Sequence, residues 1–338
     1  MQQSHRRKSP GSACAAKIRM ALLLPVMLAA LGCNSSNVQA SGSGSQLAVG
    51  SSSASSQVHS EVMTIDLSED GYTAPEMATS GYHDGQAEGN ESVRIDLSCV
   101  DEGVVAVKVS SKQKCKFQVL MGDETYTYDV DSRGEPGVFP LQCGDGHYLF
   151  RVMENVSGTK YAVLYQTEAD VYLLDEFQPF IRPSAYANYS EKSACVQKSV
   201  ELAKGAEDVN EVVAAVYGFV CKSVKYDREK AANITTGYLP DPDETFETGK
   251  GICFDYAALA ASMLRSQGIP TKVVFGYVSP DDLYHAWNMF YTPESGWITV
   301  GYEVSADDWN RLDLTFSANG ADGKFIGNGS NYTDVYFY

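Results

Sequence analysis

A cysteine at the expected start of a helix is the clearest chemical feature of this 338-residue chain. Two glycines flank Lys250, Cys253 follows, and apolar residues then recur at helical spacing until Gly268 and Pro270 supply a stop signal. Free backbone N–H groups and the positive end of the helix dipole favour an anion at a helix N-terminus. We therefore predict that the Cys253 thiol has a lowered pKa and acts as a nucleophile.

A histidine and an aspartate further along the chain could be the partners of this thiol. His285 opens an alternating run typical of a β-strand, with Trp287 on the same face. Asp313 lies in a second alternating run, residues 309–316. A nucleophilic thiol needs a base to take its proton and a third group to orient that base. The order Cys253, His285, Asp313 therefore predicts a catalytic triad for acyl transfer.

These blocks resemble the bacterial transglutaminase-like superfamily of papain-like cysteine enzymes. The resemblance covers roughly residues 212–316 and is carried by Gly251-Ile-Cys-Phe-Asp-Tyr-Ala257, Gly268-Ile-Pro-Thr-Lys-Val-Val-Phe-Gly-Tyr277, His285-Ala-Trp287, and Trp309 with Asp313-Leu-Thr315. It implies Cys253 as the nucleophile, His285 as general base and acid, and Asp313 as the residue that orients His285.

The third assignment departs from the usual pattern of that superfamily. In many relatives the aspartate follows the histidine strand after a single hairpin, where this chain has residues 297–301 and no carboxylate. An extra turn over residues 301–308 would delay the aspartate strand until Asp313. The alternatives for this role are Glu303, Asp307 and Asp308.

The periodicity of the chain predicts an α+β fold, in which the helix bearing Cys253 packs on an antiparallel sheet and a small all-β domain precedes it. Residues 90–175 show short alternating runs separated by turns, such as 134–137, which is typical of an antiparallel β domain. The resemblance implies that residues 190–338 form a papain-like transglutaminase core. This core is expected to contain helices at 194–204 and 212–224, a turn-rich segment at 226–250, and strands at 272–278, 285–291, 297–300, 309–316 and 332–338.

The N-terminus predicts export and lipid attachment. Basic residues precede the apolar run 20–31, which is shorter than the roughly 20 residues that a spanning helix needs, so residues 1–32 are expected to be a lipoprotein signal peptide. Ala30-Leu-Gly-Cys33 resembles a bacterial lipobox, with Cys33 as the lipidated residue, and an ordinary signal peptide cut elsewhere is the alternative. The Ser/Gly-rich residues 33–89 are expected to be a flexible spacer. The predicted location is therefore the bacterial cell surface, anchored in the membrane by lipid.

Charge and cysteine content exclude several classes of protein. A net charge of −17 disfavours nucleic acid and a basic surface for anionic lipid, because phosphates would be repelled. The eight cysteines include no CxxC pair, so neither a zinc knuckle nor a thioredoxin motif is supported, and no metal or organic cofactor is implied. Disulfides and buried free thiols are open alternatives for Cys99, Cys115, Cys143, Cys195 and Cys221.

The expected activity is acyl transfer on a protein or peptide substrate. The Cys253 thiolate would attack an amide carbonyl and form a thioester, which water would hydrolyse, as in a cysteine protease or amidase, or an amine would resolve, as in a cross-linking transglutaminase. The alternative is a catalytically inactive module of the same fold that binds cell-wall or protein ligands. The sequence leaves the substrate, the acyl acceptor and the oligomeric state open.

Overall fold

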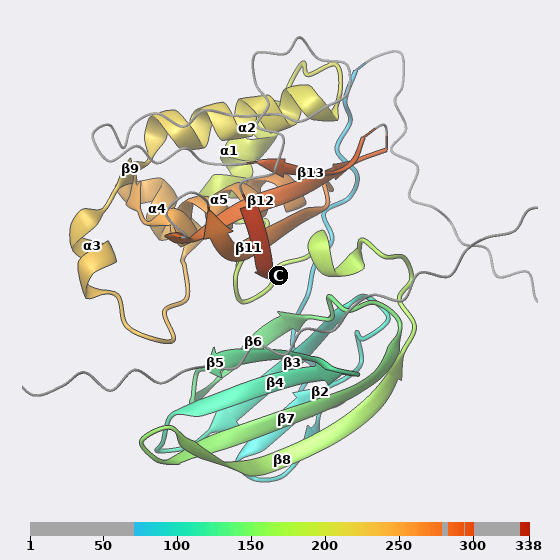
Figure 1. Cartoon of the computed structure of the whole chain (residues 1–338). Helices are drawn as coiled ribbons and strands as arrows, with labels where there is room; N and C mark the ends of the chain where they lie inside the picture. The colour runs from blue at the N-terminus through green and yellow to red at the C-terminus, as the bar shows by residue number, and fades with distance from the viewer. Residues whose placement is uncertain (1–70, 279–282, 294, 301–331) are drawn as a thin grey trace, which may run out of the picture. The chain divides into compact units, whose positions relative to one another are not determined.

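The computed structural model describes residues 71–278, 283–293, 295–300 and 332–338, and all of them belong to one compact unit, Val58–Tyr338. The described elements form an α+β fold, which confirms the predicted class (Figure 1). Within the described residues, no helix combines the length and the apolar character that crossing a bilayer requires.

The first eight strands form two four-stranded antiparallel sheets, with strand orders β1-β2-β3-β6 and β5-β4-β7-β8. Their bounds are β1 Glu88–Gly89, β2 Val93–Asp96, β3 Val104–Ser110, β4 Cys115–Met121, β5 Glu124–Val130, β6 Arg133–Pro140, β7 Gly146–Ser157 and β8 Lys160–Val171. Alternate residues of β4 are buried, and the rings of Phe117, Tyr128, Phe139 and Phe150 share one apolar core. The predicted all-β region is confirmed.

One local prediction in this region is wrong. Residues 134–137 carry glycine and proline and were expected to form a turn, but they lie inside β6, where Pro136 pairs with Lys108 and Gly137 with Val107 of β3. β6 stands at the end of its sheet, and an edge strand tolerates a proline because its outer side needs no N–H donor.

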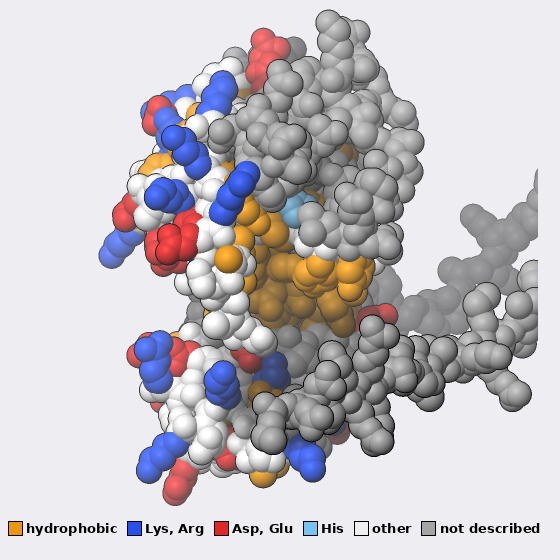
Figure 2. Space-filling view, turned by 60° about the vertical axis from the view of Figure 1, so that its left-hand side comes forward, with side chains coloured by type: hydrophobic (Ala, Val, Ile, Leu, Met, Phe, Trp, Pro, Cys, Tyr) orange, Lys and Arg blue, Asp and Glu red, His pale blue; other side chains and the backbone are white. Residues whose placement is uncertain are grey.

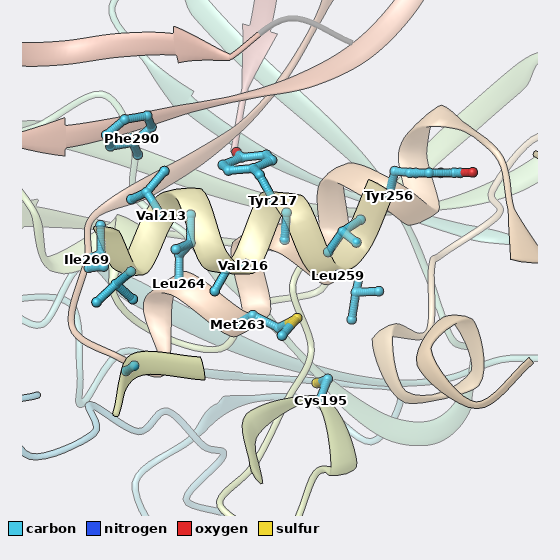
Figure 3. Close-up of a cluster of buried hydrophobic side chains, with 14 of the residues drawn as sticks. Cys195, Val213, Val216, Tyr217, Tyr256, Leu259, Met263, Leu264, Ile269 and Phe290 are labelled. Carbon is cyan, nitrogen blue, oxygen red and sulfur yellow. The ribbon is translucent and has the colours of Figure 1, made fainter. Parts of the chain in front are cut away.

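Three helices pack together: α1 Ala194–Ala203, α2 Val209–Ser223 and α5 Cys253–Arg265. The predicted helices are thus confirmed, and α2 begins at Val209 because the Asp208 carboxylate accepts the Glu211 N–H at 2.9 Å. Figure 3 shows side chains of α2 and α5 together in one buried cluster, to which α1 adds Cys195. The labelled residues in it include Val213, Val216, Tyr217, Leu259, Met263 and Leu264. Burial of each such side chain contributes about 1.5–3 kcal/mol, so this cluster fixes the position of α5.

The segment 226–250 is more regular than its turn-rich sequence indicates. It contains α3 Arg228–Asn233 and α4 Pro242–Thr248, between the short strands β9 Lys225–Tyr226 and β10 Lys250–Gly251, which pair in parallel. Both helices begin after an aspartate whose carboxylate accepts backbone N–H groups, Asp227 from Lys230 and Asp241 from Asp243 and Glu244.

A third antiparallel sheet, with strand order β13-β12-β11-β14, lies against α5. Its strands are β11 Thr271–Val278, β12 Leu283–Thr292, β13 Gly296–Val300 and β14 Tyr332–Phe337. The strand predicted for 332–338 is confirmed as β14, which pairs with β11 at the end of the sheet. The strand predicted at 309–316 lies outside the described residues.

Residues 71–89 are packed against the rest of the unit, although the sequence assigned them to a flexible spacer. The Tyr72 N–H donates to the Ala206 carbonyl at 2.8 Å, and the Ser80 hydroxyl donates to the Pro183 carbonyl at 2.6 Å. Ala206 lies between α1 and α2, and Pro183 lies between β8 and α1. Tertiary contacts therefore hold a stretch whose composition alone gave no sign of them.

Arg265, at the end of α5, is fully buried and joins three separate segments. Its guanidinium donates to the carbonyls of Thr271 at 2.8 Å, Arg182 at 3.0 Å and Tyr338 at 2.9 Å. Burial lowers the pKa of Arg265 to about 10, which leaves the group charged at neutral pH.

Candidate active site

Cys253 is the first residue of α5, and the residues just before it fix that position. Ile252 is extended, with φ −97° and ψ 176°, and its N–H donates to the Asp255 carboxylate at 2.8 Å. A Cβ on Gly251 would lie 2.6 Å from the Asp255 Cβ, so only glycine fits there without a shift. This tight turn from β10 into the helix places the cysteine at the N-terminus that the sequence predicted.

The strand that carries His285 packs on the same end of α5. The Asn288 side chain of β12 donates to the Ala257 carbonyl at 3.0 Å, and Ala286 packs with Ala257 and Ala261 of the helix. Because all three are alanines, the strand and the helix approach closely. The Ala286 N–H reaches the Cys253 thiol and lowers its pKa by hydrogen bonding. The residue that touches the sulfur is thus the one directly after His285.

Electrostatics at the thiol differ from the sequence prediction. Burial raises the pKa of the Cys253 thiol above its ordinary value, and the nearby Asp255 carboxylate adds to the rise. The N–H groups of Ala286, Phe254 and Cys253 itself act in the opposite direction, but they offset only part of the desolvation. The prediction of a lowered pKa is therefore wrong for this state of the protein, because tertiary packing outweighs the helix N-terminus.

His285 is buried as well, with 6% of its surface exposed. Its Nε2 has no hydrogen-bond partner among the residues that the structure describes. Burial lowers the pKa of His285 from 6.5 to about 4, so the imidazole is neutral at pH 7. A neutral imidazole can accept a proton, and the site at rest therefore consists of a protonated thiol and an unprotonated histidine.

The remaining predicted residues cannot be placed beside this pair. Asp313, the alternatives Glu303, Asp307 and Asp308, and the predicted lipidation site Cys33 all lie outside the described residues. The structure brings Cys253 to the strand of His285, and the third member of the triad stays a prediction.

Two tyrosines beside the sulfur were not expected to belong to the site. The phenols of Tyr226 and Tyr284 lie close enough to Cys253 that a thiolate would raise the pKa of each, in addition to the larger effect of burial. Tyr284 is 52% exposed and its ring meets that of Tyr277 edge to face at 5.4 Å. Tyr226 opens the segment that was expected to be turn-rich, and Tyr284 directly precedes the strand predicted at 285–291, so neither position indicated a part in the site.

The surface carries further hydrophobic side chains. Figure 2 shows hydrophobic side chains gathered on one face of the molecule, with basic and acidic side chains on the helical part beside them. On the sheet β13-β12-β11-β14, the exposed large hydrophobic residues include Tyr277, Tyr284, Val335 and Tyr336.

Cysteine pairing and metal binding can be assessed for the described chain. All six of its cysteines are free thiols, so the alternative of disulfides among Cys99, Cys115, Cys143, Cys195 and Cys221 is not adopted in this structure. No group of three or more His, Cys, Asp or Glu side chains in the described ranges is arranged to hold a metal ion.

Comparison with known proteins identifies the helical and sheet region around Cys253. A family model described as the transglutaminase-like superfamily matches residues 196–301, so this segment is a transglutaminase-like domain. The chain is similar to an uncharacterized protein of Mycobacterium leprae, with 29% identity over 175 residues, 48% of this chain and 54% of that protein. It is also similar to a protein-glutamine gamma-glutamyltransferase of Pseudomonas aeruginosa, with 37% identity over 79 residues, 19% of this chain and 12% of that protein.

These matches are partial in length. The chain spans about half of the Mycobacterium protein and about an eighth of the Pseudomonas protein. Among solved structures, a protein titled as a candidate cysteine protease from Cytophaga hutchinsonii superimposes with a TM-score of 0.34 and 17% identity, over 70% of this chain and 86% of that one.

Proposed function

Because residues 196–301 form a transglutaminase-like domain, we propose that this protein is a cysteine-dependent acyl-transfer enzyme that acts on amide bonds of proteins or peptides. The observation that carries the proposal is the approach of the Ala286 N–H to the Cys253 thiol, which puts the strand of His285 against the first turn of α5. In this proposal Cys253 is the nucleophile, His285 the general base and acid, and Asp313 the residue that orients the imidazole.

The proposed reaction starts from the neutral pair. As the Cys253 sulfur attacks the amide carbonyl carbon, the neutral imidazole of His285 takes the thiol proton. Backbone N–H groups at the start of α5 would hold the negative oxygen of the tetrahedral intermediate. The carbon–nitrogen bond then breaks, His285 returns the proton to the leaving ammonia or amine, and a thioester on Cys253 remains. Water releases an acid, whereas a primary amine forms a new amide.

In this proposal the raised thiol pKa sets the order of events. A thiol that is protonated at neutral pH must lose its proton during the attack, and a histidine that is unprotonated above about pH 4 is available to take it. The helix N-terminus then stabilises the charge only when it develops, which is where it accelerates the reaction.

Selective alkylation tests the assignment of the nucleophile. Wild-type protein treated with limiting iodoacetamide at pH 7 should be labelled first at Cys253, as measured by mass spectrometry of the peptides, and His285→Ala should slow that labelling. Release of ammonia from glutamine-containing peptides, with and without added amine, then separates hydrolysis from transfer. Labelling of Cys253 at the same rate as Cys99 and Cys221 in wild type would remove the basis for catalysis.

The second candidate is a module that keeps the fold and binds cell-wall or protein ligands without chemistry. The raised pKa of the Cys253 thiol favours it, because a buried thiol of this kind is ordinarily inert. The alkylation experiment distinguishes the two, since a binding module needs no dependence of Cys253 reactivity on His285.

We further propose that the protein is exported and tethered by lipid at Cys33, as the resemblance of residues 30–33 to a lipobox suggests. Expression of the full chain in a bacterial host that processes lipoproteins, with labelled palmitate, should label the wild type and not Cys33→Ser. Equal labelling of the two would reject this site.

A further inference from the structure

A buried carboxylate occupies the first turn of the helix that begins with Cys253. Asp255 is completely buried and accepts the Ile252 N–H at 2.8 Å, which fixes the entry into α5. The same carboxylate lies near enough to Cys253 to disfavour a thiolate. The group that positions the nucleophile therefore also opposes its ionisation.

Lys230 of α3 places a positive charge next to the Asp255 carboxylate. Its ammonium lies 2.9 Å from the Asp255 carboxylate and 4.7 Å from the centre of the Tyr238 ring. The Tyr238 hydroxyl donates to the other oxygen of Asp255. Three groups from two separate segments thus converge on one carboxylate, and Lys230 is the only cation paired with it among the described residues.

We propose that Lys230 is a positioning residue that neutralises the Asp255 carboxylate, so that the first turn of α5 presents no net negative charge to the Cys253 sulfur. It touches neither the thiol nor a substrate, and it acts through Asp255. This proposal deepens the proposed function, because a neutral first turn lets the backbone N–H groups stabilise the developing thiolate.

The other titratable groups near the sulfur carry no charge that could offset the Asp255 carboxylate. They are Tyr226 of β9 and Tyr284 of β12, and His285 follows Tyr284 in the same strand. The tyrosines carry no charge at neutral pH, because burial raises the pKa of each, and His285 is neutral because burial lowers its pKa to about 4. The charge at the start of α5 is therefore set by Asp255 and Lys230.

The test is the pH dependence of Cys253 alkylation by iodoacetamide, followed on the peptide that contains Cys253. Lys230→Met should raise the thiol pKa and lower the alkylation rate at pH 8 by about tenfold, as expected when a like charge loses its partner. Lys230→Arg keeps the charge and should keep most of the rate. Asp255→Asn should lower the thiol pKa, and adding Lys230→Met to Asp255→Asn should change the rate no further.

Lys198→Met is the matched control. Lys198 has the same kind of surroundings, with Glu201 at 2.9 Å and the Phe219 ring at 5.4 Å, and its side chain is 25% exposed against 26% for Lys230. It lies on α1, away from the first turn of α5, so its removal should leave Cys253 alkylation unchanged.

Two results would overturn the proposal. One is a Lys230→Met protein that remains folded and alkylates at Cys253 as fast as wild type or Lys198→Met. The other is a loss of rate when Lys230 is removed in the Asp255→Asn background, where no carboxylate remains to neutralise; this second comparison holds even if Lys230→Met alone fails to fold. A wild-type Cys253 that shows no selective alkylation would instead reject the proposed function, so the two failures are distinguishable.

Discussion

The first turns of α1 and α5 each carry a cysteine, and they differ in what surrounds the sulfur. Cys195 is the second residue of α1 and is completely buried, and its backbone N–H donates to the Asp243 carboxylate at 3.0 Å. Cys253 is the first residue of α5, is partly exposed, and receives the Ala286 N–H from β12.

The roles proposed for the two cysteines follow from this difference and not from the helix N-terminus that both share. Burial raises the pKa of both thiols, and at Cys195 the charge of Asp243 raises it further. At Cys253 the adjacent carboxylate is paired with Lys230, and a strand with a neutral histidine lies beside the sulfur. Access and neighbouring groups therefore decide between a structural and a reactive cysteine.

The largest expected difference between the two helices is in activity. Cys253→Ala should reduce amide turnover by more than about a thousandfold, as loss of a covalent nucleophile does. Cys195→Ala should keep turnover and lose roughly 1 kcal/mol of stability through the small cavity it leaves. The measurements are ammonia release from a glutamine peptide and urea unfolding of both variants. Retained turnover in Cys253→Ala would place the chemistry elsewhere.

The buried imidazole of His285, in the strand that packs on the start of α5, should affect the pH dependence of the protein's stability. The pKa of His285 is lowered from 6.5 to about 4, so the unfolded chain takes up a proton first as the pH falls. Stability from this group is complete above pH 6.5 and falls by about 1.4 kcal/mol per pH unit down to about pH 4, roughly 3 kcal/mol in total.

Urea unfolding of wild type and His285→Gln at several pH values between 7 and 4 measures this slope, which the variant should lack. His147→Gln is the control, because His147 is exposed and its pKa is raised by the Asp170 carboxylate, which gives a weak effect of opposite sign. Parallel curves for wild type and His285→Gln would show that the imidazole is not held neutral.

The turn into α5 at Gly251 should tolerate an added Cβ less well than the middle of a helix does. In Gly251→Ala the new Cβ would meet the Asp255 Cβ at 2.6 Å, so we expect a loss of about 2 kcal/mol and slower alkylation of Cys253. Gly218→Ala, in the middle of α2 with no atom within 4 Å of the new Cβ, should instead stabilise by about 0.5–1 kcal/mol. Thermal unfolding compares the two, and a neutral Gly251→Ala would mean that the turn is loose.

The smallest expected effect concerns the carboxylate at α1. Asp243→Asn removes its charge from Cys195, yet burial is the larger cause of that thiol's raised pKa, so alkylation of Cys195 should change by less than about twofold. Mass spectrometry of the Cys195 peptide under native conditions measures it. A large increase would show that charge, and not burial, keeps Cys195 inert.

The sequence predicted those helices and strands of the site that are long enough to show a repeating pattern of apolar residues or that end at glycine and proline. Gly268 and Pro270 gave the end of α5, and the alternation after Tyr284 gave β12. Periodicity did not predict α3 and α4, because helices of six and seven residues are too short to show it, although Asp241-Pro242 is a cap followed by a proline at the first helical position.

The electrostatics of the site could not be predicted in the same way. The sequence predicts free backbone N–H groups at Cys253, because a helix start is a local feature. The desolvation that raises the thiol pKa comes from burial against residues of other segments, Ala187, Val273 and Ala286, which are brought there only by folding. Lys230 likewise stands 25 residues before Asp255, and nothing in their spacing links them.

The hydrogen bonds of Arg265 affect which truncated versions of this protein can fold. Three of its acceptors, the Arg182 carbonyl, the Ser184 hydroxyl and the Tyr338 carbonyl, lie outside the segment 196–301 that matches the superfamily. An excised fragment with those boundaries would leave the Arg265 guanidinium with the Thr271 carbonyl and without these three acceptors, at a cost of several kcal/mol. Recombinant truncations should therefore keep residues 182–184 and 338, and a minimal version drawn from sequence similarity alone is expected to be insoluble.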